Sequence, residues 1–298
     1  MGTRLARFYE ALSNGNTLLS CRIWLTKALA ETWQVFTIFN LMTLGMDHTD
    51  EIVRAAALLR KARHAIALTG AGTSTASGIP DFRSPGTGLW ERAGPMEVAS
   101  IYAFRRHPET FYTWIRPLMR TLLTAEPNAG HLALAELESG GWLRAIITQN
   151  IDGLHQRAGS RVVLELHGHL REVTCLDCGR VLPIEELLDD FLSSGEVPRC
   201  LACSGVMKPK VVLYGEQLPI EAVSTAMEHV RQADLMLVTG SSLEVAPASQ
   251  LPLRVRERAG RLIVINLMPT YIDDIAEVVI HADVTDVLPR IAQVCLGG

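Results

Sequence analysis

Short apolar runs alternate with helical patterns along most of this chain, and that alternation constrains the fold more than any other feature. Helical stretches separate the runs at residues 129–138, 219–233 and 247–259. Strands that are apolar throughout must be covered on both faces, as in a parallel sheet with helices on each side. The pattern therefore predicts a doubly wound α/β fold, in which ligands bind beyond the carboxyl ends of the strands. The expected strands are residues 64–69, 144–148, 162–166, 211–214, 235–239, 262–265 and 278–281.

The composition is that of an ordinary globular protein. Apolar residues make up 48% of the 298 residues and charged residues 20%, which excludes a disordered or collagen-like chain. Lys plus Arg total 28 against 32 Asp plus Glu, so the net charge of −4 offers no basic surface for nucleic acid. Lys27 and Glu31 interrupt the nearest candidate for a membrane span. Because no secretory signal pattern is present either, we expect a cytoplasmic protein without membrane partners.

Three segments depart from the alternation. Residues 1–46 carry no recognisable motif, and they are either an additional helical arm or sequence that precedes a translation start at Met46. A long excursion rich in Pro and Gly follows the first strand and predicts a loop and helical module over the ligand site. Four cysteines mark a small inserted module. We expect an N-terminal extension at residues 1–46 and a small domain at residues 171–209. The large domain comprises residues 47–170 and 210–298 and includes the excursion at 84–128.

Two C-x-x-C pairs carry the clearest chemical signal. Two residues between thiolates let both reach one ion, and four thiolates complete a closed tetrahedral zinc site. The gap between the pairs is slightly longer than in most zinc ribbons, and a redox pair or free thiols are the alternatives. A closed site has no open coordination position, so we expect one structural Zn²⁺ per chain. The expected ligands are Cys175, Cys178, Cys200 and Cys203.

Glycine-rich and polar clusters follow three of the expected strands. The first strand leads into a Gly-Ala-Gly turn at residues 70–72, where a backbone without side chains can approach a pyrophosphate. As a dinucleotide fingerprint the turn is incomplete, because Thr75 stands at the position of the third glycine, and an ordinary tight turn is the alternative. Clusters at residues 148–155 and 165–168 place polar side chains at the ends of two other strands. We expect all three clusters to meet at one site.

In these clusters the chain resembles the sirtuins, which are NAD-dependent protein lysine deacylases. The motifs run in family order from about residue 50 to the C-terminus, with mild departures at Thr73 and Tyr214. Besides the cysteine pairs, the matching segments are 70–83 (GAGTSTASGIPDFR), 148–152 (TQNID), 167–168 (HG), 214–216 (YGE), 240–243 (GSSL) and 265–266 (IN).

The resemblance implies a Rossmann-like large domain, a small zinc domain, and a cleft that binds NAD and an acetyl-lysine peptide. Residues 211–216 and 242–245 would flank the peptide as neighbouring strands. Asp152 would contact the nicotinamide carboxamide, and Arg83 would pair with phosphate. The implied NAD-binding residues are Ala71, Thr75, Phe82 and Arg83 in the cofactor loop; Gln149, Asn150, Ile151, Asp152 and His167 around the nicotinamide and its ribose; and Ser241, Ser242, Asn266, Asp283 and Val284 at the phosphates and adenosine.

The resemblance also implies a general base. In the family's reaction a histidine takes a proton from a ribose hydroxyl, and nicotinamide, free lysine and O-acetyl-ADP-ribose are released. The His-Gly context after a strand selects His167, whereas the residues alone leave His155 and His169 as rivals. The expected function is NAD-dependent protein lysine deacetylation. The alternatives are ADP-ribosyl transfer to protein, a non-enzymatic NAD-sensing or zinc-ribbon module, and, less in keeping with the motifs, an NAD dehydrogenase.

The acyl group that is removed can also be anticipated. Relatives that remove carboxylated acyl groups carry a Tyr-x-x-Arg pair on the helical segment after the cofactor loop. Here Tyr112 and Arg116 are four residues apart. We therefore expect a preference for acetyl-lysine, with longer neutral acyl chains also accepted, over succinyl- or malonyl-lysine. The alternative is that Arg116 or Arg120 reaches the acyl channel from a shifted helix.

Overall fold

A computed structural model describes residues 47–84, 86, 88–91 and 94–297, and those from His48 onward belong to one compact unit. The expected N-terminal extension, residues 1–46, lies outside the described residues. In the described part no helix is long and apolar enough to cross a membrane.

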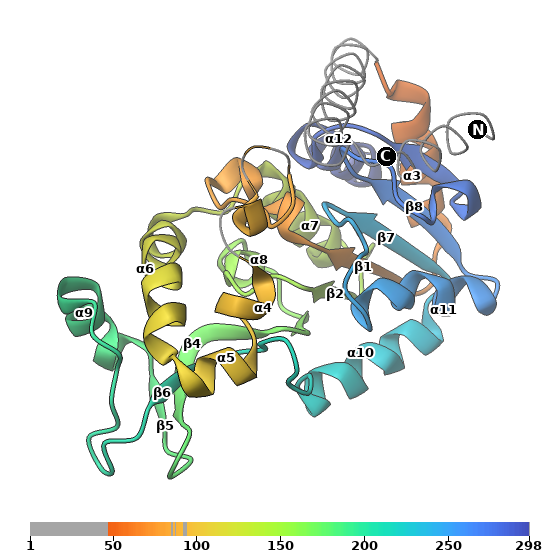
Figure 1. Ribbon diagram of the computed structural model, residues 1–298. Coiled ribbons are helices and arrows are strands. Elements are labelled where there is room, and N and C mark those ends of the chain that lie inside the picture. Colours follow the sequence, from red (N-terminus) through yellow and green to blue (C-terminus); the bar gives the residue numbers. More distant parts are fainter. Residues whose placement is uncertain (1–46, 85, 87, 92–93, 298) are drawn as a thin grey trace, which may run out of the picture. The chain divides into compact units, whose positions relative to one another are not determined.

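The centre of the fold is a parallel sheet of six strands in the order β3-β2-β1-β7-β8-β9 (Figure 1). Every neighbouring pair in it is parallel. This arrangement confirms the α/β fold that the apolar runs predict. The strands are β1 (Ala65–Thr69), β2 (Ala145–Thr148), β3 (Val163–Glu165), β7 (Leu235–Thr239), β8 (Arg261–Ile265) and β9 (Val278–Ile280).

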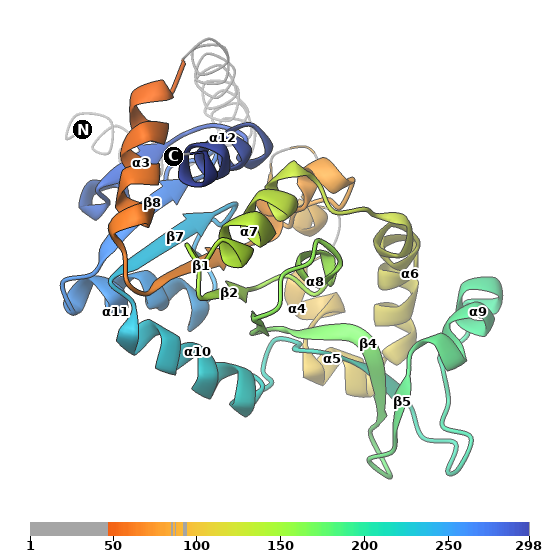
Figure 2. The same ribbon diagram turned by 180° about the vertical axis from the view of Figure 1, so that it is seen from behind.

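Helices cover both faces of this sheet (Figures 1 and 2). Alternate residues of β1 point to opposite faces: Ala65 and Ala67 belong to one buried cluster, and Ile66 and Leu68 belong to the other. Burial on both faces explains why the strand is apolar throughout. The first cluster is closed by α3 (Thr49–Lys61), α7 (Ala129–Ser139) and α12 (Val284–Leu296), and the second by α10 (Ile220–Gln232), the 3-10 turn η4 (Ala248–Gln250) and α11 (Leu251–Glu257).

A second, antiparallel sheet of three strands lies beside the first, in the order β5-β4-β6. One expected strand is wrong: residues 211–214 add no strand to the parallel sheet. Val211 ends β6 in the small sheet, and Tyr214 makes only an isolated bridge to Ser100. A short apolar run specifies a strand but not its partner, and here the partner belongs to the other sheet. The elements are β4 (Gly168–Cys175), β5 (Val181–Pro183), β6 (Met207–Val211) and the helix α9 (Glu185–Ser194).

The excursion after β1 is helical, as expected, and it packs next to the small sheet. Its core contains Phe104, Phe111 and Tyr112, which contact one another edge-on or tilted, and Tyr112 also meets Phe191 of α9. The helices are α4 (Pro95–Val98), α5 (Ile101–Arg106) and α6 (Pro108–Thr124), and the remaining short elements are η1 (Ala71–Thr73), η2 (Thr75–Ser77), η3 (Leu89–Glu91), α8 (Leu154–Arg157) and η5 (Asp273–Ile275).

Candidate active site

The strand register brings the predicted residues together at one edge of the parallel sheet. Thr69, the last residue of β1, pairs with Thr148 on one side and with Thr239 on the other. Thr239 pairs in turn with Ile265, and Thr148 with Glu165. The loops that follow these residues therefore start side by side. They carry Ala71, Thr75, Gln149–Asp152, Ser241, Ser242, Asn266 and His167.

Glycines bring the loops after β1 and β7 into close contact. Gly72 N–H donates to the carbonyl of Gly240 at 2.8 Å. Gly240 has a φ of +59°, and a Cβ there would lie 2.3 Å from the Thr73 nitrogen. A Cβ on Gly70 would lie 2.7 Å from the Gly240 oxygen. No larger residue fits, so the backbone itself lines the start of η1, as a pyrophosphate site at such a turn requires.

Asp152 is held from two sides behind this turn. Its carboxylate accepts a hydrogen bond from the Ser74 hydroxyl at 2.7 Å and another from the Leu154 N–H at 2.9 Å. Asn150 donates to the same Ser74 oxygen and to the Gly70 carbonyl, each at 3.1 Å. Burial raises the pKa of Asp152, although these donors act in the opposite direction. The loops after β1 and β2 are thus joined through Ser74 and through the Asn150–Gly70 hydrogen bond.

Two buried imidazoles lie beneath this network. His131 and His155 stand with ring centroids 4.8 Å apart, and they are 0% and 1% exposed. His131 Nε2 lies 3.4 Å from the Ser74 hydroxyl, and His155 Nε2 lies 2.9 Å from the Thr69 hydroxyl. Burial lowers the pKa of His131 to about 4 and that of His155 to about 3. His155, a rival for the general base, is therefore a core residue that faces a threonine.

His167 is held at the junction of the two sheets. It lies between β3 and β4, and its carbonyl accepts a hydrogen bond from the Val212 N–H at 2.8 Å. Its Nδ1 lies 3.1 Å from the carbonyl oxygen of Gln149. Because a carbonyl can only accept, Nδ1 carries the proton and Nε2 is left as the basic nitrogen. Burial lowers the pKa of His167, so the imidazole is neutral at pH 7.

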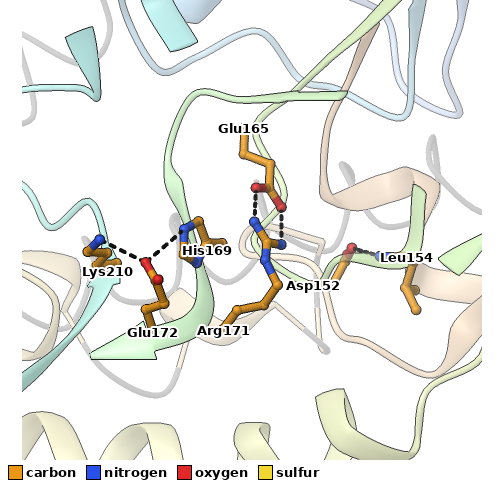
Figure 3. Close-up of polar contacts among 7 residues, drawn as sticks. All are labelled: Asp152, Leu154, Glu165, His169, Arg171, Glu172 and Lys210. Carbon is orange, nitrogen blue, oxygen red and sulfur yellow. Dashed lines mark hydrogen bonds and ion pairs between the residues drawn. The ribbon is translucent and has the colours of Figure 1, made fainter. Parts of the chain in front are cut away.

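His169, the other rival, belongs to a different cluster. Its Nε2 lies 3.9 Å from Glu172, which also binds Lys210 at 2.7 Å (Figure 3). Glu172 and Lys210 belong to β4 and β6, so this charged group lies on the small sheet. His155 and His169 therefore lie in other clusters, whereas His167 contacts the carbonyl of Gln149, in the segment that carries Asn150 and Asp152.

The cofactor loop presents an aromatic side chain and a cation. Phe82 stacks on Trp90 with ring centroids 5.0 Å apart, and Trp90 stacks on Trp114 at 5.5 Å. Arg83 Nε lies 2.7 Å from the Glu244 carboxylate in the segment that the resemblance assigns to the peptide. This ion pair was not anticipated from the sequence. It places the expected phosphate-binding cation next to the loop after β7.

The remaining predicted NAD residues lie along the same edge. Gln149 donates to the Ser241 hydroxyl at 2.9 Å, which links the loops after β2 and β7. Asn266 follows β8 and donates to the Met268 carbonyl at 2.7 Å. Asp283 caps α12 by accepting from the Thr285 N–H at 2.8 Å, so its carboxylate is engaged by its own helix. Ser242 is exposed, whereas Ile151 is partly buried and Val284 is buried.

The four predicted zinc ligands converge. Their sulfur atoms lie within 4.8 Å of one another, with Cys175 and Cys203 at 3.5 Å and Cys178 and Cys200 at 3.7 Å. Zn–S bonds of about 2.3 Å place tetrahedral sulfurs about 3.8 Å apart, so the donor set fits zinc.

The two cysteine turns have matching backbones. The Cys175 N–H donates to the Arg180 carbonyl, and the Cys175 carbonyl accepts from the Gly179 N–H. In the second turn the Cys200 N–H donates to the Gly205 carbonyl, and the Cys200 carbonyl accepts from the Ser204 N–H. Backbone N–H groups, first that of Ala202, lower the pKa of Cys200 to about 7. The Gly205 N–H lowers the pKa of Cys203, but the neighbouring thiols raise it to about 12. A shared cation removes this conflict between thiolates.

Sequence reasoning missed the residues that support this site from behind. His131 was not singled out, although Asn128 and His131 form a capping box at the start of α7 that could have marked it. The roles of Ser74 and Glu244 depend on contacts between distant segments, and no local pattern signals them.

Comparison with known proteins identifies the family. Residues 70–247 match the model of the Sir2 family. The chain belongs to the Sir2 family. The NAD-dependent protein deacetylase of Sulfurisphaera tokodaii is 50% identical to it over 236 residues, which cover 79% of this chain and 92% of that relative. The NAD-dependent protein deacetylase 1 of Geobacillus kaustophilus is 49% identical, over 75% of this chain and 89% of the relative.

Solved Sir2 structures share the fold. A Sir2 complex with a deacetylated p53 peptide and 3'-O-acetyl ADP-ribose has a TM-score of 0.77 at 41% identity, and the match covers 80% of this chain and 96% of that chain. A complex of Sir2 with a p53 peptide and NAD⁺ has a TM-score of 0.75 at 40% identity, covering 83% and 98%.

Proposed function

We propose that this chain uses NAD to remove acetyl groups from lysine side chains of proteins, with His167 as the general base. The chain is an NAD-dependent protein deacetylase of the Sir2 family, as its relatives and the Sir2 complexes with NAD⁺ and 3'-O-acetyl ADP-ribose indicate. The observation that supports the role of His167 is its Nδ1 contact with the Gln149 carbonyl at 3.1 Å. Residues 47–170 and 210–298 would bind NAD, and residues 171–209 would bind zinc.

The chain's own residues would divide the work. Bound NAD supplies the ribose whose C1′ carbon receives the acetyl oxygen and whose hydroxyl loses a proton. His167 Nε2 would accept that proton, and the Gln149 carbonyl would stabilise the imidazolium that forms. Asp152, fixed by Ser74 and Leu154, would orient the nicotinamide carboxamide. Phe82 would keep water from C1′, and Arg83 would leave Glu244 to pair with phosphate.

Product analysis tests this function. The protein is incubated with NAD and an acetyl-lysine peptide, and both products are weighed by mass spectrometry. Deacetylation predicts equal amounts of the deacetylated peptide and O-acetyl-ADP-ribose. A mass increase on a protein acceptor would instead indicate ADP-ribosyl transfer, and reduced cofactor would indicate hydride transfer. Either of these results, without the acetylated product, would overturn the proposal.

A further inference from the structure

Glu165 and Arg171 form an ion pair that closes the loop carrying His167. Glu165 ends β3 and Arg171 lies in β4, on either side of His167. Arg171 donates one hydrogen bond to each carboxylate oxygen, at 2.8 and 2.5 Å (Figure 3). Two parallel bonds fix both planar groups, which a single contact does not do. Exposed ion pairs are usually weak, but a two-bond geometry on a carboxylate that is only 10% exposed is the exception.

The same guanidinium lies near the turn that follows β2. A Cβ placed on Gly153 would be 3.9 Å from Arg171 Nη1, and Gly153 comes directly after Asp152. Glu165 is also paired with Thr148 in the sheet, one residue before Gln149. Arg171 is therefore bonded to the end of β3 through Glu165 and lies near the turn at Gly153.

Removal of Arg171 would leave the Glu165 carboxylate without its partner, near the Asp152 carboxylate. Burial is the main cause that raises the pKa of Asp152, and the negative charge of Glu165 raises it further. Without its partner, the nearly buried Glu165 would have to find another cation or displace its loop, because an unpaired charge in such a position is costly. Both outcomes would disturb the Asp152 turn and the His167 loop together.

We propose that Arg171 is a positioning residue, which through its ion pair with Glu165, next to the turn at Gly153, keeps the Asp152 turn and the His167 loop in the arrangement that binds the nicotinamide end of NAD. The proposal rests on the proposed function, since it takes Asp152 to contact nicotinamide. It assigns a role to two side chains outside the set predicted to touch NAD.

The test compares two ligands that differ only at the nicotinamide end. Dissociation constants for NAD and ADP-ribose are measured by calorimetry on the full chain, without turnover. Arg171→Ala should raise the constant for NAD about tenfold and leave that for ADP-ribose within about twofold. Arg171→Lys, which offers a point charge without the fork, should lie between wild type and Arg171→Ala. Adding Glu165→Gln to Arg171→Ala should recover part of the NAD affinity, because it removes the unpaired charge.

A control is Arg256→Ala, which breaks an arginine–glutamate pair held by one bond, with Glu277 at 2.8 Å, in another part of the fold. It should change neither constant. Unchanged NAD affinity in Arg171→Ala, or equal losses for NAD and ADP-ribose with a lower melting temperature, would overturn the proposal. Failure of the proposed function is distinguishable, because the wild-type protein would then release no O-acetyl-ADP-ribose, whatever the two ligand affinities.

Discussion

His167 Nδ1 lies 3.1 Å from the carbonyl oxygen of Gln149, and this contact joins the loops after β2 and β3. It determines the tautomer, because the carbonyl accepts the Nδ1 proton and leaves Nε2 as the basic nitrogen. The same backbone segment carries Asn150 and Asp152. The proposed base is therefore bonded to the backbone segment that carries the proposed nicotinamide-binding residues.

Loss of zinc should unfold the small sheet. Among the described residues, its own buried cluster consists of Val173, Cys175, Cys200 and Met207, and two of these are predicted zinc ligands. Cys175→Ala should lower the zinc content from one per chain to near zero and abolish deacetylation indirectly, because metal binding contributes to folding. Cys295→Ala is the control, since Cys295 is buried in α12. Elemental analysis measures the zinc content. A wild-type protein that contains no zinc after purification without a chelator would contradict the site.

Acetyl-lysine should be preferred over succinyl-lysine. Tyr112 donates its hydroxyl to the Met207 carbonyl at 2.5 Å, and burial raises its pKa. Arg116 and Arg120 both donate to the Leu192 carbonyl near the end of α9. The side chains of Tyr112, Arg116 and Arg120 thus bind α6 to the small domain. Burying a carboxylate without a cation costs about 3–5 kcal/mol, so kcat/KM should be at least about 10²-fold higher for the acetyl peptide. Equal turnover of matched peptides would show that a cation reaches the channel.

Ser74→Ala should weaken NAD binding more than peptide binding. The substitution removes the 2.7 Å donor to Asp152 and the acceptor of Asn150. A charge-assisted hydrogen bond contributes about 1.5–3 kcal/mol, which corresponds to a rise of about tenfold or more in the KM for NAD. The KM for the acetyl peptide should change little. Ser77→Ala, in the next 3-10 turn, serves as the comparison, and equal effects of the two variants would contradict the role of Ser74.

The strand ends and the zinc ligands could be predicted from the sequence, whereas the supporting contacts could not. Apolar runs and C-x-x-C spacing are local patterns, and they located β1, β2 and the cysteine turns correctly. The Ser74–Asp152 bond joins residues 78 positions apart. Such pairings depend on strand order, which no local pattern contains. For the same reason the run at residues 211–214 was assigned to the wrong sheet.

Stability should fall as the pH drops below 6.5. The pKa values of His131 and His155 are lowered to about 4 and about 3 in the folded state, whereas both groups titrate near 6.5 when unfolded. The unfolded chain therefore binds protons first, and stability that is complete above pH 6.5 is lost toward pH 4. Each group contributes a few kcal/mol by this linkage, since one pKa unit is about 1.4 kcal/mol.

The melting temperature between pH 7.5 and 4.5 measures this effect. His155→Gln should flatten the dependence, although it lowers stability at pH 7.5. His107→Gln replaces a histidine that is 69% exposed and should leave the curve unchanged. An unaltered slope in His155→Gln would contradict the assignment of a buried neutral imidazole.

The most direct measurement is single-turnover deacetylation by His167→Ala beside His169→Ala, with O-acetyl-ADP-ribose as the product that is counted. Both proteins should have the wild-type circular dichroism spectrum and zinc content. We expect His167→Ala to slow the step by about 10²–10⁴, the usual loss of a positioned general base, and His169→Ala to remain within a few-fold of wild type. A folded His167→Ala protein with near-normal turnover, or a larger loss in His169→Ala, would contradict the role assigned to His167.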